Sequence, residues 1–478
     1  MVVNKKLDDD VFFEQRKEVL SLWHTGKEVN LDDAIEYNKT LLDKQNYAVK
    51  LKRAKETGEI YAVTGMGKST VDEQIELMQY AEKEGDADTL ALSPDSLTRY
   101  NRFEEVQKYM EESERTGKSK LNGVPVVNIG VHGIRRIVDS VNCPVNLRGG
   151  MPDGRLMAEV LHAGGVTSNA PDLLMDFWQH SAKTPYEYVV GTHQYVGRLM
   201  GYYTERGIPL SGGGQGFYGA AIPPSLQSAS IVVSDLLLVT QGVRTINISC
   251  TGHGNLVQDV ATARARESVL HYYFNKFGYN DVETLKSYSW SLMQYPADVG
   301  PSLAVNFMNT LAAKLIGAQS NDVRTMAEAK AIPTKENIAE TLKIAKIMKN
   351  FIKDQQIEVD KDELALQISM EEKEIKAIVD KILEIGDGDI LAGAEKAIES
   401  GILDNPFAAN RAAAGKVLGV KDSEGAIRYF STGNLPFSQE TIDYHKEKIS
   451  EREKKQGITI GYDTIVSDIY AVSKGYLV

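Results

Sequence analysis

The chain has 478 residues, with 54 lysines and arginines against 66 aspartates and glutamates, and its formal net charge at pH 7 is -12. This length corresponds to two or three domains at about 150 residues each. The acidic balance argues against a chain-wide surface for nucleic acid or anionic membrane, because each phosphate contact requires a surplus of lysine or arginine. Local basic sites remain compatible with it.

Cysteine and histidine usage argues against a disulfide framework and against a metal site. Cys143 and Cys250 are the two cysteines, and the histidines lack H-x-x-H spacing. The first 15 residues are charged where a signal peptide is apolar, and the most apolar run, 231–239, is about half of a membrane span. We therefore expect a cytoplasmic protein without a membrane or nucleic-acid partner.

Apolar periodicity divides the chain into three regions. Helical spacing predicts helices at 9–23 and 31–44, within an amino-terminal helical preface at 1–57. From about residue 58, short apolar or β-branched runs alternate with amphipathic segments, such as 71–83 and 154–164. The runs predict strands at 59–63, 88–92, 124–130, 144–147, 166–168, 208–212, 243–249, 285–290 and 316–325.

Roughly eight strands separated by helices over about 270 residues favour a closed (β/α)8 TIM barrel over an open doubly wound sheet, which is the alternative. Charged amphipathic helices predominate after residue 333. We predict an α/β protein with a TIM-barrel catalytic domain at 58–345 and a mostly helical carboxyl-terminal region at 346–478. Ligands are expected at the carboxyl ends of the parallel strands.

The segment AVTGMGKST at 62–70 resembles a phosphate-binding loop, with Gly67, Lys68 and Ser69 in order and Ala62 in place of the first glycine. A nucleoside triphosphatase also needs an aspartate after an apolar strand to hold magnesium. Asp235 is the candidate, although its surroundings predict a helix. The segment therefore has two interpretations, a nucleotide-binding loop or a glycine-containing turn after the first barrel strand.

Two arginines follow predicted strands. Arg99 lies just beyond 88–92, and Arg148 lies just beyond 144–147 and precedes two glycines. A guanidinium fork at a strand end can bind a carboxylate, so the pair indicates an anionic substrate. The alternative for each arginine is a salt bridge to a carboxylate in a loop.

Several loops in this order resemble the epsilon chain family of glutamate mutase, also called methylaspartate mutase. The resemblance covers essentially the whole chain. It rests on LTRYNR (97–102), KLNGVP (120–125), NLRGGMPDGRLMAEVLHAGGVTSN (146–169), IPPS (222–225), GYNDVETL (278–285), AIPTKE (331–336), NPFAANRAAAGK (405–416) and GNLPFS (433–438).

The resemblance implies the large chain of an adenosylcobalamin-dependent carbon-skeleton mutase that acts by a radical mechanism. Adenosylcobalamin would be bound jointly with a separate small cobalamin-binding subunit, because the D-x-H-x-x-G loop of such subunits is absent here. The family further implies a homodimer of this chain within a heterotetramer, and a small carboxylate substrate. No catalytic side chain is assigned.

The family's cofactor contacts carry over to several positions. Arg324 replaces a lysine that contacts ribose, Glu328 matches the ribose-binding glutamate, and Tyr295 stands where the family has an aromatic residue against the cofactor. The cofactor-binding residues implied in this way are Gly67, Asn122, Tyr295, Arg324, Glu328 and Ile332.

The substrate positions differ more. Arg99 and Arg148 match two of three arginines that bind carboxylates, whereas Gly65 occupies the third position and Lys68 follows three residues later. The implied substrate-binding positions are Arg99, Arg148, Gly149 in place of a histidine, Ala170 in place of the ammonium-binding glutamate, and Asp176 and His180 in place of two tyrosines.

We therefore expect a mutase whose substrate keeps at least one carboxylate but lacks the amino group or carries a different tail. The alternatives are a non-catalytic partner, or scaffold, of the cobalamin-binding subunit and a phosphate-loop nucleotide-binding enzyme.

Overall fold

The computed structural model describes residues 2–216, 221–290 and 295–478. The helices predicted at the amino terminus are confirmed as α1 (Asp9–Ser21) and α2 (Leu31–Leu41), and α3 (Tyr47–Thr57) follows them. Asn30 sets the start of α2, because its side-chain oxygen accepts the otherwise free backbone amides of Asp32 and Asp33.

Strands and helices alternate after α3, as the sequence predicts. The strands form two sheets, in the orders β1-β8-β7-β6-β5 and β2-β3-β4, and every pairing within these sheets is parallel. The protein is therefore α/β with parallel sheets. The strands are β1 (Tyr61–Val63), β2 (Gly65–Met66), β3 (Leu90–Leu92), β4 (Val145–Leu147), β5 (Ser211–Gly212), β6 (Thr245–Gly252), β7 (Glu283–Trp290) and β8 (Ser320–Asp322).

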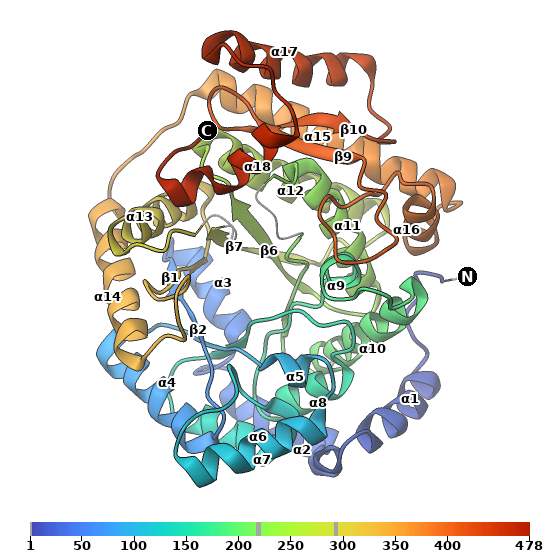
Figure 1. The fold of residues 1–478 in the computed structure, drawn as a ribbon. Helices are drawn as coiled ribbons and strands as arrows, with labels where there is room; N and C mark the ends of the chain where they lie inside the picture. The colour runs from blue at the N-terminus through green and yellow to red at the C-terminus, as the bar shows by residue number, and fades with distance from the viewer. Residues whose placement is uncertain (1, 217–220, 291–294) are drawn as a thin grey trace.

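Helices lie around the outside of these strands, with the strands near the centre of the view in Figure 1. This arrangement suits parallel strands, because each crossover helix packs back onto the sheet. The connecting helices are α4 (Val71–Gly85), α5 (Ser96–Arg99), α6 (Phe103–Thr116), α7 (Val126–Asp139), α8 (Arg155–Ala163), α9 (Leu173–Gln179), α10 (Tyr186–Thr204), α11 (Pro224–Thr240), α12 (Leu256–Lys276) and α13 (Val299–Ile316).

The two sheets are neighbours at both of their ends. Thr64 alone separates β1 from β2. On the other side, the backbone amide of Leu147 in β4 donates to Oγ of Ser168 at 3.0 Å, and Ser168 forms a parallel bridge with Ser211 in β5. Residue 168 therefore lies between β4 and β5 and contacts both strands.

The prediction of a strand at 124–130 is wrong, because this segment begins α7. Val127, Val131, Ile134 and Val138 have the spacing of one buried helix face, and the β-branched side chains masked that period. The run at 166–168 forms only the bridge through Ser168. The other predicted runs each contain a strand, at 59–63, 88–92, 144–147, 208–212, 243–249, 285–290 and 316–325.

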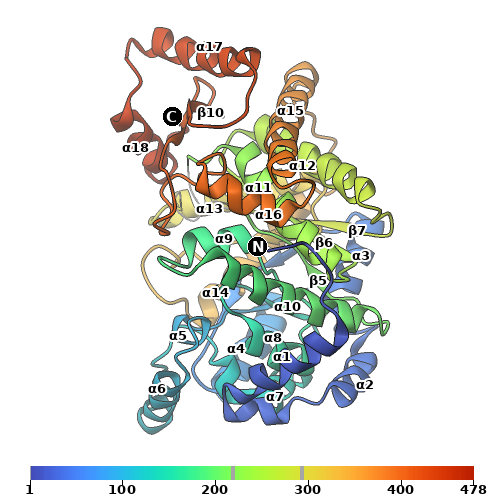
Figure 2. The ribbon, with the colours of Figure 1, turned by 90° about the vertical axis from the view of Figure 1, so that its right-hand side faces the viewer.

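The chain after residue 334 is mostly helical and contains one antiparallel hairpin, β9–β10. Helix α15 packs against α11 and α12. Figure 2 shows α17 and α18 at one end of the molecule, close to β10. The elements are α14 (Lys335–Ile352), α15 (Lys361–Ile385), α16 (Ile390–Glu399), β9 (Val417–Lys421), β10 (Ile427–Thr432), α17 (Gln439–Gln456) and α18 (Tyr462–Ala471).

One continuous hydrophobic core connects the regions. It includes Phe12 from α1, Leu90 from β3, Leu238 from α11 and Ile378 from α15. These residues are far apart in sequence, so the amino-terminal helices and the carboxyl-terminal helices α14 to α16 bury their apolar faces against the same central layer. Helices α17 and α18 pack in a smaller separate cluster with β9. Among the described residues, every helix is too short or too polar to cross a lipid bilayer.

A buried ion pair joins α17 to α18. Nη1 of Arg452 lies 2.7 Å from Oδ2 of Asp468, which also accepts the backbone amide of Lys421 at 3.0 Å. Because removing one partner leaves an unpaired buried charge, we expect Asp468→Ala to lower the free energy of unfolding in urea by about 3–5 kcal/mol. Asp43→Ala, which breaks an exposed pair with Arg53, should change it by less than about 0.5 kcal/mol. Equal effects of the two substitutions would contradict this assignment.

Candidate active site at the carboxyl ends of the strands

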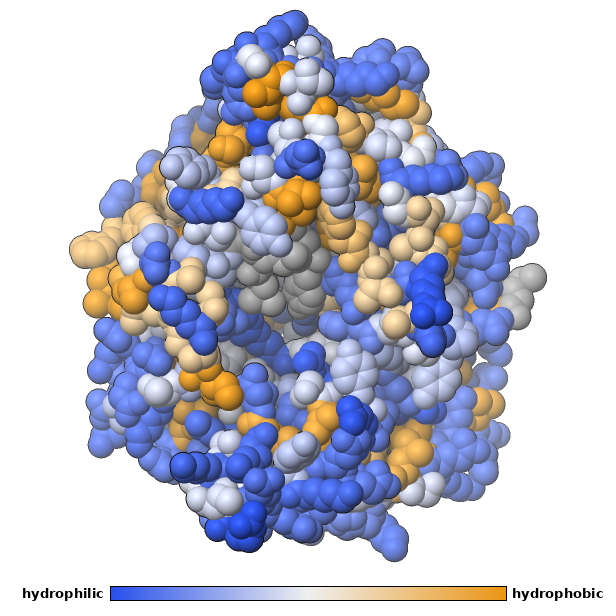
Figure 3. Space-filling model, viewed as in Figure 1, coloured by the Kyte–Doolittle hydropathy of each residue, from blue (hydrophilic) through white to orange (hydrophobic). Residues whose placement is uncertain are grey.

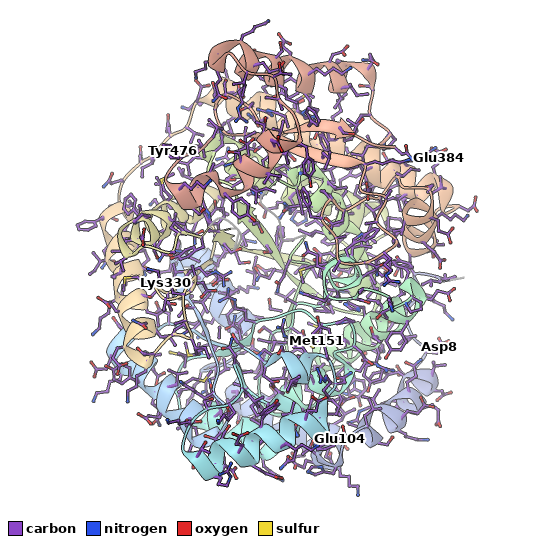
Figure 4. The ribbon with its side chains drawn as sticks, in the orientation of Figure 1. Asp8, Glu104, Met151, Lys330, Glu384 and Tyr476 are labelled. Atoms are coloured by element: carbon purple, nitrogen blue, oxygen red, sulfur yellow. The ribbon has the colours of Figure 1, made fainter. Side chains whose placement is uncertain are left out.

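A cavity of about 770 Å³ opens at the carboxyl ends of the strands. The face in Figure 3 is hollowed near its centre. Lys330, after β8, and Met151, after β4, lie on opposite sides of this face (Figure 4). Short polar side chains of β6 and β7, such as Asn247, Ser249 and Ser287, line the deeper wall, so the cavity suits a polar ligand.

Ten of the twelve site residues predicted from the sequence line this cavity. The exceptions are Asp176, which lies behind His180, and Tyr295, which lies behind the segment after β8. The lining residues are Gly67, Arg99, Asn122, Arg148, Gly149, Ala170, His180, Arg324, Glu328 and Ile332.

In the segment that resembles a phosphate-binding loop, the backbone amides of Lys68 and Ser69 and the Ser69 hydroxyl are hydrogen-bonded within the protein. The Ser69 hydroxyl is buried against Ser119 and accepts the backbone amides of Lys120 and Leu121 at 3.0 and 2.9 Å. The backbone amide of Lys68 donates to the Gln74 side chain at 2.8 Å. These groups are used within the fold, so the interpretation as a turn after the first strand is favoured over nucleotide binding.

Gly67 permits a close approach of two loops at the cavity wall. A Cβ atom at this position would lie 2.6 Å from Cα of Gly123 and 2.7 Å from the carbonyl oxygen of Ser93. Any side chain would therefore separate the loop after β2 from the loop that carries Asn122.

Arg99 ends α5, whose start is fixed by Asp95. The Asp95 carboxylate accepts the backbone amides of Leu97 and Thr98 at 2.9 and 3.0 Å. Burial raises the pKa of Asp95, although hydrogen bonds from Thr98 oppose this effect. Nε of Arg99 is buried without a hydrogen-bond partner. The guanidinium therefore has donor capacity available for a ligand.

Arg148 follows β4 and is partly neutralised by a carboxylate. Its Nη2 atom lies 3.1 Å from Oδ2 of Asp322 at the end of β8. Arg148 thus forms a salt bridge, although with a carboxylate at the end of a strand rather than in a loop, and the side chain still lines the cavity. A Cβ atom at Gly65 would lie 2.8 Å from Nη1 of Arg148 and 2.8 Å from Oγ of Ser93. Arg148 therefore uses the space beside Gly65, where the resemblance placed a third arginine.

Asp322 belongs to a chain of alternating charges that the sequence analysis missed. Its Oδ2 atom also lies 3.4 Å from Nη2 of Arg324, and Nη1 of Arg324 lies 3.7 Å from Oε1 of Glu328. Burial raises the pKa of Asp322 to about 6, against the opposing charge of Arg148. An acidic residue at the carboxyl end of a predicted strand was the available signal.

Tyr295 supports this segment from behind. Its hydroxyl donates to the backbone carbonyl of Arg324 at 3.1 Å and lies 2.7 Å from Oγ of Ser302, and Asn306 Nδ2 donates to it at 3.1 Å. Burial raises the pKa of Tyr295 to about 12. The ring packs with Trp290 and Val305. Tyr295 therefore holds the backbone of Arg324 in place.

Asp176 accepts hydrogen bonds from two histidines. Oδ1 lies 2.7 Å from Nδ1 of His180, and Oδ2 lies 2.9 Å from Nε2 of His193 in α10. Asp176 and His193 are buried, whereas His180 reaches the cavity. His193 was missed because a lone histidine inside a helix carries no distinguishing spacing.

Two further buried carboxylates hold the glycine-rich segment 211–216. Asp172 accepts the backbone amides of Gln215 and Gly216, each at 2.7 Å, and Asp235 accepts that of Gly214 at 2.7 Å. Burial raises the pKa of both carboxyl groups, more strongly for Asp235. Asp235, the candidate magnesium ligand of the nucleotidase alternative, therefore anchors a loop from within α11.

Comparisons with known proteins agree on one family. A family model described as methylaspartate mutase E chain (MutE) matches residues 41–478. The glutamate mutase epsilon subunit of Treponema denticola is 38% identical over 99% of this chain and 98% of its own length. The proteins of the same name from Desulfitobacterium hafniense and Escherichia coli O157:H7 are 36% and 33% identical, over 100% and 99% of this chain and 99% and 98% of their own lengths.

The family model thus covers most of the chain, and relatives above 30% identity cover nearly all of it. The resemblance inferred from the loop motifs is confirmed. Four of these motifs, at 97–102, 120–125, 146–169 and 331–336, contribute residues to the cavity. The chain belongs to the methylaspartate mutase E chain family, a family of mutases.

Proposed function

We propose that this chain is the large subunit of an adenosylcobalamin-dependent carbon-skeleton mutase whose substrate is a small carboxylic acid. The observation that carries the proposal is the convergence of Arg99, Arg148, Arg324 and Glu328 in one cavity at the strand ends. The relatives are named glutamate mutase epsilon subunits, and a name of this kind implies at least one further subunit.

The two parallel sheets are proposed to form one closed (β/α)8 barrel. This proposal is supported by the short link through Thr64 between β1 and β2 and by the contacts of residue 168 with β4 and β5. In a barrel, all parallel strands end on the same face, which accounts for one cavity with contributions from β2, β4 and β8.

Arg99 and Arg148 are proposed to bind a substrate carboxylate. Nε of Arg99 is buried without a hydrogen-bond partner, and Nη2 of Arg148 pairs with Asp322. A guanidinium presents several donors in one plane, so Arg148 is suited to hold Asp322 and a ligand carboxylate together. The backbone at Gly149 has a φ of 140° and adds no side chain between the arginines and the ligand.

Arg324 and Glu328 are proposed to bind the ribose of the coenzyme. Glu328 is exposed at the cavity wall and its contact with Arg324 is long, at 3.7 Å, so its oxygens are available to sugar hydroxyls. Gly67 and Asn122 form a wall without bulky side chains, and Ile332, 56% exposed, provides an apolar contact at the rim. These residues fit an adenosyl group.

Adenosylcobalamin supplies radical chemistry when bound. The tasks left to this chain are to hold the substrate carboxylate, orient the sugar and keep water from reactive species. Adenosylcobalamin is proposed to be bound jointly with a small cobalamin-binding subunit, in a heterotetramer built on a dimer of this chain. A purely scaffolding role is less well supported, because Arg99 retains unused donors inside the cavity.

The direct test of this proposal mixes the chain with the small cobalamin-binding subunit of its own organism and adenosylcobalamin. Glutamate, glutarate and 2-hydroxyglutarate are then added separately. We expect a cob(II)alamin signal by electron paramagnetic resonance with at least one acid and none without acid. Absence of a signal with all three acids and with a wider panel of small carboxylates would contradict the proposal.

Arg148→Lys should reduce kcat/KM by about 10- to 100-fold, because an ammonium replaces a fork that forms an ion pair with Asp322 and can donate charge-assisted hydrogen bonds to the ligand. Steady-state kinetics of the complex measure this change. The matched control is Arg136→Lys, which alters an exposed pair with Asp72 and should leave kcat/KM within about twofold. An unchanged rate in Arg148→Lys would remove its proposed role.

Glu328→Gln should raise the dissociation constant of the coenzyme by about tenfold, because a neutral amide is a weaker acceptor for sugar hydroxyls than a carboxylate. Coenzyme titration of the assembled complex measures it. Glu36→Gln, at a carboxylate with 72% exposure that pairs with Lys39 outside the cavity, serves as the matched control. The assignment fails if the two variants bind the coenzyme equally well.

A further inference from the structure

The side of the cavity formed by α9 contains a relay of three side chains, His180, Asp176 and His193. The Asp176 carboxylate lies between the two imidazole rings, at 2.7 Å from His180 Nδ1 and 2.9 Å from His193 Nε2. Nδ1 of His193 lies 2.8 Å from the backbone carbonyl oxygen of Val189. The relay extends from the buried core of α10 to the cavity wall.

The contacts at both ends of His193 define its protonation. A carbonyl oxygen only accepts hydrogen bonds, so Nδ1 of His193 donates to Val189. Nε2 then faces the carboxylate of Asp176. Burial by itself lowers the pKa of His193, but the hydrogen bond and charge of Asp176 outweigh burial and leave that pKa raised. Both ring nitrogens of His193 thus face hydrogen-bond acceptors, so protonation of the ring is favoured and places its positive charge against the carboxylate of Asp176.

His180 lines the cavity, and its Nδ1 atom faces Asp176. In the tautomer that carries its hydrogen on Nδ1, the lone pair is on Nε2. Gly150 lets the ring lie close to the loop after β4, since a Cβ atom there would be 2.8 Å from Cε1 of His180. A Cβ atom at the adjacent Gly149 would lie 3.5 Å from Cδ of Arg99. The His180 acceptor and the Arg99 donors therefore flank the same two glycines.

The charges of the cavity wall disfavour an ammonium group. Among the described lining residues, the cations are Arg99, Arg148, Arg324 and Lys330, and the carboxylates are Asp322 and Glu328. Asp322 is paired with Arg148 and Arg324, and Glu328 is near Arg324. Ala170 adds no charge. Lys330 is in turn paired with Asp298 at 3.5 Å, so the surplus is one positive charge. This surplus favours an anionic ligand such as a dicarboxylate, whereas an added ammonium would have no unpaired carboxylate as a partner.

From this geometry we propose that the substrate is a hydroxy dicarboxylic acid, and that its hydroxyl group donates a hydrogen bond to Nε2 of His180 while a carboxylate binds Arg99 and Arg148. This inference rests on the proposed function and specifies its substrate class. His180 contacts the substrate. Asp176 and His193 are positioning residues, which hold the imidazole with its acceptor towards the cavity.

The test compares three ligands that share one carbon skeleton, namely glutarate, 2-hydroxyglutarate in both enantiomers, and L-glutamate. Calorimetric titration of the full chain gives the dissociation constant of each. We expect one enantiomer of 2-hydroxyglutarate to bind about three- to tenfold more tightly than glutarate, the range of one added neutral hydrogen bond. L-glutamate is expected to bind more weakly than that enantiomer.

Variants of His180 and Asp176 then test whether the tighter binding of 2-hydroxyglutarate depends on these side chains. The ratio of the glutarate to the 2-hydroxyglutarate dissociation constant should approach one in His180→Leu and recover in part in His180→Gln, whose amide restores an acceptor. Asp176→Asn should lower the ratio as well, since the ring loses its orienting carboxylate. His132→Leu, at an exposed histidine of α7, is the control and should leave the ratio unchanged. A purely structural role of Asp176 would weaken both ligands equally and keep the ratio.

Ala170→Glu provides the complementary change. It adds a carboxylate at the cavity wall and should move the preference from the hydroxy acid towards L-glutamate, measured with the same titrations. The inference is overturned if the hydroxyl gives no advantage over glutarate, if the advantage survives in His180→Leu, or if the unaltered chain prefers L-glutamate. In each of these cases a cob(II)alamin signal with any acid would still support the proposed function, so the two failures are distinguishable.

Discussion

The ion pair between Arg148 and Asp322 is the contact on which the site depends, because it joins the carboxyl ends of β4 and β8. These strands belong to different sheets. The Arg148 side chain passes Gly65 on the way, and a Cβ atom there would meet its guanidinium at 2.8 Å. The pair holds Arg148, the proposed carboxylate-binding group, in the cavity and leaves Asp322 shared with Arg324. The proposed substrate-binding and cofactor-binding positions are therefore electrostatically connected.

Elsewhere in the fold, buried carboxylates hold loops in place by accepting hydrogen bonds from backbone amides. Asp95 fixes the turn that presents Arg99, and Asp172 and Asp235 hold the glycine-rich segment after β5. Asp404 accepts four consecutive amides, from Ala414 to Val417, ahead of β9. Burying a carboxylate is costly unless its oxygens are hydrogen-bonded, so each of these loops is tied to one conformation. A rigid cavity wall is what a site for reactive species requires.

Periodicity predicted most of the fold because local patterns encode helices and strands. The alternation after residue 58 followed from it, and so did the position of Arg148 directly after β4, whereas Arg99 ends the short helix α5 that follows β3. The failure at 124–130 has a physical cause, since three valines and an isoleucine in that run suit a strand locally while burial of one helix face decides the outcome. Asp322 and His193 could not be assigned in this way, because their roles arise from partners 174 and 17 residues away along the chain.

Relative to the family pattern, the cavity has lost charged side chains of both signs. The resemblance places an arginine at position 65 and a glutamate at position 170, and the chain has Gly65 and Ala170 instead. Losing one charge of each sign leaves the net charge of the cavity unchanged. The aspartate at 176 is buried behind His180 and faces the two histidines rather than the cavity. The positions of the charged side chains that can pair with a ligand are different. A dicarboxylate still meets cationic side chains, whereas a positively charged group of the ligand no longer meets an unpaired carboxylate beside the glycines that flank Arg99 and His180.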